Sequence, residues 1–474
     1  MNKIEEFYIN WSNSVGEFLK DYLYAPNGKK LKPRFVFKQL KKYVKRLQNS
    51  QLNPYEKVIL LPGLRGVGKT TLLAQIYYDT LKYNKVQPFY ISADRLAALG
   101  IKLWDFYEFI KGNVYPTYRK KKILLLIDEI QYDPNWALFL KLVYDENVNN
   151  KNLLVIATGS SALFLNTQNQ DLVRRSLTVR ILPATFREFL HLHKGINISQ
   201  QISTRLIRYL FFSKNAKHLY QSIQTLRPKI LHELKKIPNF TATFKEYLQR
   251  GSLPFSATLP NGLALDKIRE MVLINIVQKD ILRVGRFEAS VLAKIPDLLF
   301  LLANSDEITT GNLAQTLNLS QGTINKILDT LQKTELLIEL PPYGRPYTQV
   351  RKSSKFIFIT PNIRAALLQG LINGHKGKLL EDYFGLVFKT YLNEKVKLLH
   401  SYAKNSADFI LRTADNSEII VETSFNKEST TQIINTLAKT EDRVKYSLLI
   451  GSKNLELVES KNIVKIPLEY AVLV

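Results

Sequence analysis

A glycine-rich loop between an apolar segment and a helix-compatible segment constrains the fold of this chain more than any other feature. The apolar run Val58–Leu61 leads into Gly63-Leu64-Arg65-Gly66-Val67-Gly68-Lys69-Thr70, and Thr71–Ile76 then suits a helix. This is the pattern G-x-x-x-x-G-K-S/T, whose glycines let backbone N–H groups approach a phosphate while the helix N-terminus favours its negative charge. The pattern predicts a P-loop in an α/β fold with a parallel sheet.

The residue types of this loop indicate ATP and Mg²⁺ as cofactors. We expect Lys69 to reach the β- and γ-phosphates, where it acts in catalysis, and the Thr70 hydroxyl to ligate Mg²⁺. The cofactor-binding residues expected in this segment are Gly63, Arg65, Gly66, Gly68, Lys69, Thr70 and Thr71.

Two further apolar runs end in polar residues. Ile123–Ile127 lacks alternation, which is typical of a strand buried on both faces of a parallel sheet. At its end, Asp128 is expected to hold Mg²⁺ and Glu129 to act as the base that orients the attacking water. The run Leu153–Ala157 ends in Thr158-Gly159-Ser160-Ser161, and hydroxyls there, with Ser160 as our candidate, are expected to sense the γ-phosphate.

The composition excludes several classes of protein. The 474 residues are 45% hydrophobic and 23% charged, which suits about three globular domains rather than a disordered chain. There is no cysteine, so disulfides, thiolate zinc sites and cysteine nucleophiles are excluded. No apolar run approaches the roughly 18 residues of a membrane-spanning helix, and Met1–Glu6 has two acids and no apolar signal core. We expect a cytoplasmic protein without a membrane contact.

The charge balance points to a polyanionic partner. The formal net charge is +26, and residues 373–474 carry 14 basic and 13 acidic residues, so +25 lies in residues 1–372. Between Tyr22 and Tyr55 there is no acid but nine basic residues. DNA is the expected partner, with Lys41, Lys42 and Lys45 among its contacts; an anionic membrane surface is the alternative polyanion. A lysine-rich composition with a solvated helix face would give the same pattern.

The second half of the chain has two patterns that suit an ATPase acting on DNA. Ser203–Asn239 reads as helical, with eight Lys or Arg against one acid, and its charge suits either DNA or solvent. In position this segment resembles the helical lid that follows an AAA-type core and closes over the nucleotide. Asn312–Leu317, a turn, and a helix beginning after Ser320 then form a helix-turn-helix pattern, with Leu337–Val350 as a β-hairpin wing. The expected DNA contacts are Gln321, Thr323, Lys326 and Arg345. Such modules also serve as spacers or protein contacts.

At this point the chain resembles the prokaryotic AAA-type ATPases that carry a restriction-endonuclease-like C-terminal domain. The residues that carry the resemblance are Leu126–Gln131, Trp136, Lys141, Tyr144 and Thr158–Ser161, with weaker matches at Arg174-Arg175, Pro183–Phe189 and Tyr247–Pro254. The resemblance covers about nine-tenths of the chain. It implies that Arg175 is an arginine finger that stabilises γ-phosphate charge, in cis or across a subunit interface. Arg174, Arg180 and Arg187 are equally available from the sequence.

The resemblance also implies a nuclease-like site near the C-terminus. Its three acids match Glu381, Asp408 and Glu422, but Ser424 stands where the family has a lysine. Without that lysine the attacking water lacks its activating group, unless Lys404 or Lys427 substitutes in space. We therefore expect a degenerate site that keeps the fold without cutting DNA.

These patterns predict an α/β chain of five parts. They are a basic N-terminal helical segment (1–52), a P-loop AAA-type ATPase core (53–200), a helical lid (201–290), a winged helix-turn-helix (291–350) and a degenerate restriction-endonuclease-like domain (351–474).

The predicted function is that of a Mg²⁺-dependent ATPase that binds DNA and remodels it or moves along it. Forks and four-way junctions are the candidate substrates, and a homo-oligomeric ring, for example a hexamer, is the expected assembly. The alternative is a nucleotide-driven switch in signalling or defence that acts through a protein partner. A third hypothesis is an ATP-gated nuclease.

Overall fold

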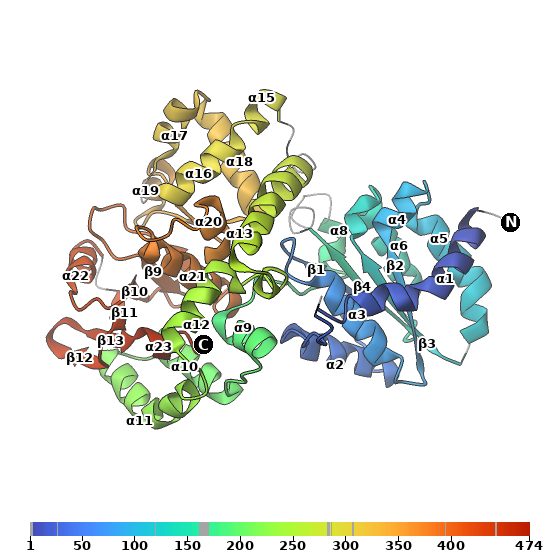
Figure 1. The fold of residues 1–474 in the computed structure, drawn as a ribbon, viewed down its shortest axis with the longest axis horizontal. Helices are drawn as coiled ribbons and strands as arrows, with labels where there is room; N and C mark the ends of the chain where they lie inside the picture. The colour runs from blue at the N-terminus through green and yellow to red at the C-terminus, as the bar shows by residue number, and fades with distance from the viewer. Residues whose placement is uncertain are drawn as a thin grey trace. The chain divides into compact units, whose positions relative to one another are not determined.

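The computed structural model describes residues 3–25, 27–118, 120–160, 170–281, 285, 287–305, 308–393, 395–440 and 443–474. Ser161 lies outside these ranges. The chain folds into two compact units, Met1–Leu182 and Pro183–Val474, which are described separately (Figure 1).

The first unit is built on a five-stranded parallel sheet in the order β2-β3-β4-β1-β5. Every residue of β1 and β4 is buried, which explains why their sequences are apolar without alternation. The strands are β1 (Val58–Pro62), β2 (Val86–Ser92), β3 (Lys122–Asp128), β4 (Leu153–Gly159) and β5 (Leu177–Thr178).

Helices surround this sheet. Among them, α3 packs on β2 and β3, while α2 packs on β3 and β4. The carbonyls of Leu47 and Gln48 at the end of α2 accept hydrogen bonds from Lys122 Nζ, at 2.9 Å each, so β3 caps this basic helix. The α-helices are α1 (Lys3–Asp21), α2 (Val36–Gln48), α3 (Lys69–Thr80), α4 (Ala93–Ala98), α5 (Leu103–Phe109), α6 (Trp136–Asn147) and α8 (Gln170–Val173).

The first part of the second unit is helical. The buried Asn362 of α20 (Pro361–Leu367) bonds to this part: its Oδ1 accepts from the Ser252 amide at 2.7 Å, and its Nδ2 donates to the Tyr247 carbonyl at 2.8 Å. Gly251 allows this close packing, because a Cβ there would lie 2.8 Å from the Phe189 ring. The elements are α9 (Phe186–Phe189), α10 (Gln200–Phe212), α11 (Ala216–Leu234), α12 (Phe240–Glu246), η7 (Tyr247–Gly251), α13 (Asn261–Glu270), η9 (Met271–Asp280), α15 (Ala289–Leu292) and α16 (Ile295–Asn304).

A helix pair and a short sheet follow. Helices α17 (Thr310–Leu317) and α18 (Gln321–Lys333) lie where the sequence predicts them, each capped by a hydroxyl, of Thr309 and Ser320. The hairpin expected within 337–350 is wrong in its bounds. β6 (Leu337–Leu340) pairs with β7 (Lys355–Phe358), and α19 (Pro346–Arg351) lies between them, because the register joins Leu337 to Phe358.

The chain ends in a six-stranded mixed sheet, in the order β12-β13-β11-β10-β9-β8, and α21 packs on its strand β10. Its interior strands are almost wholly buried, as their apolar sequences require. The elements are α20 (Pro361–Leu367), α21 (Lys376–Tyr391), β8 (Val396–Leu399), β9 (Phe409–Thr413), β10 (Glu418–Thr423), α22 (Thr431–Leu437), β11 (Val444–Ser452), β12 (Glu456–Val458), β13 (Ile463–Pro467) and α23 (Leu468–Ala471). In the described part of the chain, no helix combines the length and apolarity needed to cross a membrane.

Candidate active site

The parallel register of the first sheet brings three strand ends together. β1 pairs with β4 so that Leu61 lies opposite Thr158, and β2 pairs with β3 so that Ser92 lies opposite Asp128. Since parallel strands end at the same edge, the loop after β1 opens beside Asp128 and Thr158. The predicted P-loop and the two predicted polar strand ends therefore form one site.

The loop geometry explains its glycines. Gly66 and Gly68 have φ of 78° and 87°, a left-handed conformation that favours glycine, and Gly68 is the N-cap of α3. A Cβ on Gly63 would lie 2.5 Å from the Ile181 carbonyl oxygen, so this position requires glycine for a different reason. Lys69 is buried, and its Nζ donates to the carbonyls of Gly63 at 2.8 Å and of Leu64 at 3.2 Å.

Asp128 is the centre of a hydrogen-bond network. Its Oδ2 accepts from Thr70 Oγ1 at 2.7 Å and from the Tyr90 hydroxyl at 3.1 Å. Its Oδ1 accepts from the Thr158 hydroxyl and from the Glu129 amide. Burial, followed by the charge of Asp128, raises the pKa of Tyr90 far above its ordinary value, so the phenol stays a donor. The carboxylate is thus oriented by groups from α3, β2 and β4.

Glu129 has an unusual backbone for its residue type. Its φ is +51°, and its amide also donates to Thr158 Oγ1 at 3.2 Å. A non-glycine residue in this conformation is uncommon and typical of functional sites. The carboxylate accepts a hydrogen bond from Gln131 Nε2. Burial raises the pKa of Glu129, and the Lys69 charge opposes that effect.

The site fits ATP and Mg²⁺ by its donor set. Mg²⁺ bound with a nucleotide needs few protein oxygens, because the phosphates supply others, and the adjacent Thr70 hydroxyl and Asp128 carboxylate are such oxygens. Ser160 Oγ is buried and has no hydrogen-bond partner among the described residues, which leaves a donor available for a phosphate oxygen. Thr71 and Arg65 are partly buried on the same loop and helix start.

The candidate arginines lie in different environments. Arg175 Nε donates to Asp145 at 2.8 Å at the surface of the first unit. Arg174 and Arg180 are exposed in the same unit. Arg187 is buried within the second unit, where it donates to Ser203 Oγ and Gln200 Oε1. Its role there is to hold α10.

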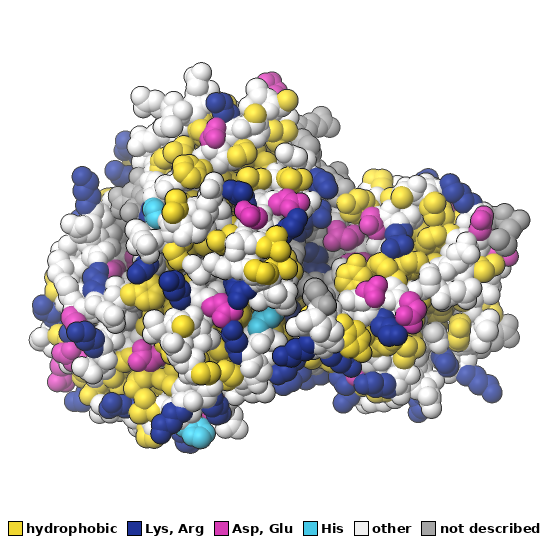
Figure 2. Space-filling model, viewed as in Figure 1, with side chains coloured by type: hydrophobic (Ala, Val, Ile, Leu, Met, Phe, Trp, Pro, Cys, Tyr) yellow, Lys and Arg dark blue, Asp and Glu magenta, His cyan; other side chains and the backbone are white. Residues whose placement is uncertain are grey.

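The predicted DNA contacts are mostly accessible. Figure 2 shows Lys and Arg side chains gathered over α2, where Lys42 and Lys45 are exposed. Lys41 differs, because its Nζ pairs with Asp79 at 2.9 Å, and this hydrogen bond raises the pKa of Lys41. On the second unit Gln321, Lys326 and Arg345 are exposed, whereas Thr323 is partly buried with its hydroxyl 2.9 Å from that of Ser320.

The acids of the predicted nuclease-like site carry lysine partners. Glu381 pairs with Lys355 at 2.5 Å, and Glu422 pairs with Lys427, one of the two lysines expected to substitute. Burial raises the pKa of Asp408 well above its ordinary value, and the charges of Glu381 and Glu422 raise it further. Within the described ranges, no three His, Cys, Asp or Glu side chains lie close enough together to hold a metal ion. The arrangement is that of an ion-pair cluster.

Sequence reasoning missed three residues of these sites. Tyr90 bonds to Asp128 from a strand that was not predicted. Arg34 donates to the Val67 carbonyl in the P-loop at 2.9 Å, and Lys355 reaches Glu381 from β7. Each contact joins residues that are far apart in sequence, so no local pattern predicts it. The one available signal was the run of basic residues without an acid in which Arg34 lies.

Comparisons with known families cover two parts of the chain. Residues 55–190 match the model described as an AAA domain, which agrees with the predicted ATPase core. Residues 241–371 match a domain of unknown function, DUF8612.

Two relatives span nearly the whole chain. An uncharacterized protein of Methanocaldococcus jannaschii, MJ1637, is 37% identical over 453 residues, covering 92% of this chain and 88% of the relative. An uncharacterized protein of Haemophilus influenzae is 24% identical over 411 residues, covering 85% of this chain and 90% of the relative.

Two solved structures illustrate distant similarity. The Aeropyrum pernix Orc1 protein in complex with DNA has a TM-score of 0.33 at 12% identity, covering 72% of this chain and 92% of that one. The Thermotoga maritima RuvB branch migration motor has a TM-score of 0.26 at 14% identity, covering 65% and 89%. These scores are too low to show a shared overall architecture.

Proposed function

This chain belongs to the family of the M. jannaschii protein MJ1637 and contains an AAA domain, and on that premise we propose that it is a Mg²⁺-dependent ATPase that binds DNA and remodels it or moves along it. The observation that carries the ATPase proposal is the contact between Thr70 Oγ1 and Asp128 Oδ2, at 2.7 Å, directly beside the left-handed Glu129. It joins the P-loop to the two acids at the end of β3.

Each residue of the site has a role in this proposal. The amides of the loop and Lys69 bind the β- and γ-phosphates, while Thr70 and Asp128 hold Mg²⁺, which offsets phosphate charge when bound. Glu129 accepts the proton of the attacking water, and Gln131 and Thr158 hold it in place. Ser160 donates to a phosphate oxygen. Arg175 leaves Asp145 and acts as the arginine finger on the γ-phosphate, in its own copy or in a neighbouring one. Action on a neighbouring copy requires a homo-oligomer.

The DNA proposal is supported by charge. The excess of +25 in residues 1–372 includes the exposed Lys42 and Lys45 on one helix, a row suited to phosphates. Lys326 and Arg345 are exposed on the second unit, within the proposed winged helix. Contact with few base edges suits structured DNA, such as forks or four-way junctions, more than a specific sequence.

The test is ATP hydrolysis with and without single-stranded, duplex and four-way-junction DNA at several salt concentrations. Glu129→Gln should lose hydrolysis while still binding nucleotide, and Glu17→Gln, which removes an exposed carboxylate on α1, is the matched control. Contact with about eight phosphates gives a log–log salt slope near −7 for duplex DNA. Stimulation by one DNA form that fades with salt supports the proposal, and turnover and binding indifferent to every DNA refute its DNA part.

A nucleotide-driven switch that acts through a protein partner is the second candidate, because it needs the same site without DNA. Slow turnover that no DNA stimulates favours it. Nuclease activity is not proposed, since among the described residues no three His, Cys, Asp or Glu side chains lie close enough together to hold a metal ion. Plasmid incubated with Mg²⁺ or Mn²⁺ should stay intact with the wild type and with Glu422→Ala alike.

A further inference from the structure

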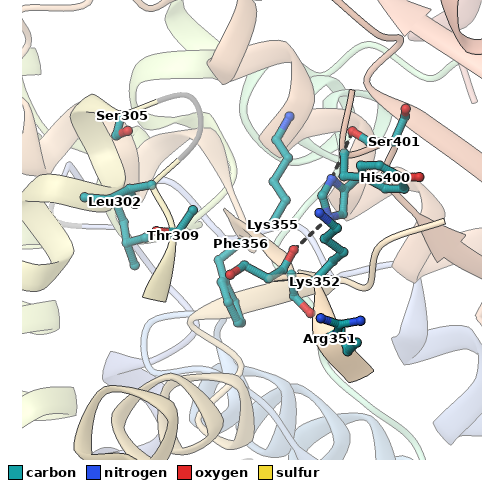
Figure 3. Close-up of a pocket in the computed structure, with 13 residues that line it drawn as sticks. Leu302, Ser305, Thr309, Arg351, Lys352, Lys355, Phe356, His400 and Ser401 are labelled. Carbon is teal, nitrogen blue, oxygen red and sulfur yellow. Dashed lines mark hydrogen bonds between the residues drawn. The ribbon is translucent and has the colours of Figure 1, made fainter. Parts of the chain in front are cut away.

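A cavity of about 290 Å³ lies within the second unit, whereas the P-loop belongs to the first. It is bounded by the end of α16, the start of α17, the segment that joins α19 to β7, and the loop after β8. Figure 3 shows Leu302 and Thr309 on one side of it and Arg351, Lys352 and His400 on the other. Neither the AAA domain nor the predicted nuclease-like acids include these residues.

The cavity combines three kinds of lining. Leu302, Ile308 and Phe356 supply an apolar wall. Hydroxyls of Ser305, Thr309, Ser353, Ser354 and Ser401 supply donors and acceptors, and the basic side chains are Arg351, Lys352 and Lys355. A ligand that satisfies all three has a flat apolar body, polar edges and a negative charge.

Two of these cations are available to an anion. Lys355 is already paired with Glu381 at 2.5 Å. By contrast, Arg351 and Lys352 are exposed, and no carboxylate within the described ranges pairs with either. Arg351 lies 5.2 Å from the centroid of the Tyr347 ring and donates to its hydroxyl. These two side chains therefore carry the uncompensated charge at the cavity.

Aromatic rings stand beside both cations. Lys352 Nζ lies 5.4 Å from the centroid of the Tyr402 ring, and Tyr402 lines the cavity while 54% exposed. Tyr347, under Arg351, is 70% exposed. Cations next to exposed aromatic rings are the combination that binds single-stranded nucleic acid, because bases stack on the rings while the cations contact phosphates.

His400 does not contribute charge. Its Nδ1 and Nε2 each lie 3.2 Å from a backbone carbonyl, of Ser401 and Ser353, so both ring nitrogens face the protein (Figure 3). Burial and then the charge of Lys355 lower the pKa of His400 to about 4, which leaves the ring neutral at pH 7. Binding of an anion here then depends on Arg351 and Lys352.

We propose that this cavity receives one unpaired nucleotide of DNA, with its base against Phe356 and Tyr402 and its phosphate at Arg351 and Lys352. The volume lies just below the range of roughly 300–1,000 Å³ for ligand sites, which suits a single nucleotide and excludes a duplex. A base enters such a cavity only when it is out of the stack, as at a fork or junction. The inference rests on the proposed DNA function for the source of the nucleotide.

The test measures binding of a single-stranded oligonucleotide that contains 2-aminopurine, of duplex DNA, and of free dAMP to the full chain. Arg351→Ala combined with Lys352→Ala removes the two cations, and Tyr402→Leu removes the stacking ring while keeping an apolar side chain. Lys214→Ala combined with Lys461→Ala is the control, since both lysines are exposed in the same unit outside the cavity. All changed residues are exposed, so the fold is retained.

We expect the cation variant to flatten the log–log salt slope for single strands by about 1.4. Tyr402→Leu should weaken the single-stranded complex about tenfold and diminish the fluorescence change of 2-aminopurine. The control variant should keep the cavity-dependent fluorescence change. Binding of dAMP that is lost in the same variants, without any binding of DNA, would support the nucleotide site but contradict DNA as its source and the DNA part of the proposed function.

The remaining outcomes are equally decisive. If the wild type binds DNA and the cavity variants bind it with the same affinity, salt slope and fluorescence change, the cavity proposal is wrong while the proposed function stands. If the wild type binds neither DNA nor dAMP, the cavity proposal and the DNA part of the proposed function are both wrong.

Discussion

Tyr90 is predicted to control the proposed Mg²⁺ site through its hydrogen bond to Asp128. Its hydroxyl donates to Asp128 Oδ2 at 3.1 Å, on the oxygen that also accepts from Thr70. Tyr90→Phe removes this one donor and keeps the ring, which packs near Trp11 and Phe18 with centroids 6.2 and 6.1 Å away. The fold should therefore remain, whereas the Asp128 carboxylate should lose one of the donors that orient it.

The magnitude follows from the partner's charge. A hydrogen bond to a charged group contributes about 1.5–3 kcal/mol, and loss of a residue that orients a metal ligand typically costs about 10–100-fold in metal affinity or activity. These ranges agree, since about 1.4 kcal/mol corresponds to tenfold. We expect Tyr90→Phe to raise the Mg²⁺ concentration for half-maximal ATP hydrolysis, or to lower turnover, by a factor within that range.

The assay is hydrolysis as a function of Mg²⁺, together with binding of a fluorescent ATP analogue with and without Mg²⁺. Nucleotide affinity without Mg²⁺ should be unchanged, because the P-loop is intact. Tyr77→Phe is the control, since Tyr77 is also buried and its hydroxyl bonds to no residue that the structure describes. If Tyr90→Phe matches Tyr77→Phe and the wild type in both measurements, the proposed role of the Asp128 network is refuted.

Three further predictions concern stability. Gly63→Ala places a Cβ 2.5 Å from the Ile181 carbonyl oxygen, so thermal unfolding should show a loss of about 1–3 kcal/mol, and an unchanged melting temperature would contradict the close contact. Arg364→Ala leaves the wholly buried Asp382 without its cation, and denaturant unfolding should show a free energy of unfolding lower by about 3–5 kcal/mol. Arg364→Met combined with Asp382→Leu should restore much of that loss. The pKa of His400 falls from 6.5 in the unfolded chain to about 4 in the folded one, so between these pH values the unfolded state binds more protons. The free energy of unfolding therefore decreases as the pH falls through that window, by up to about 3 kcal/mol. His400→Gln should flatten this dependence, and an unaltered pH profile would show that burial does not hold the ring neutral.

The predicted ATPase core shows which features a sequence carries locally. The P-loop and the strands at β1, β3 and β4 were predicted because their residues are contiguous and their apolar runs are unbroken. β2 was not predicted, because Gln87 and Pro88 interrupt its pattern. Its place at the edge of the sheet explains the proline, since an edge strand pairs on one side only. β5 has only two residues, too few for any pattern.

The wing of the proposed helix-turn-helix shows the limit of turn signals. The segment after Leu340 has two prolines and a glycine, which favour a tight hairpin, yet the second strand lies at Lys355–Phe358 beyond a helix. Proline and glycine indicate that the chain turns, but they do not indicate which later segment pairs with the first strand. Which later segment returns to pair is decided by the side chains that become buried, here Leu337 opposite Phe358.

The sequence by itself determined which functional groups are present: a P-loop, two acids after a buried strand, an excess of positive charge and no cysteine. Tertiary structure decided which of those groups meet. It placed Tyr90 on Asp128, paired Lys41 with Asp79 and Lys355 with Glu381, and left Arg351 and Lys352 beside a cavity. The physical reason is that charge and hydrogen bonding act over a few ångströms in space, and the folded sheet and helices set those distances between residues far apart in the chain.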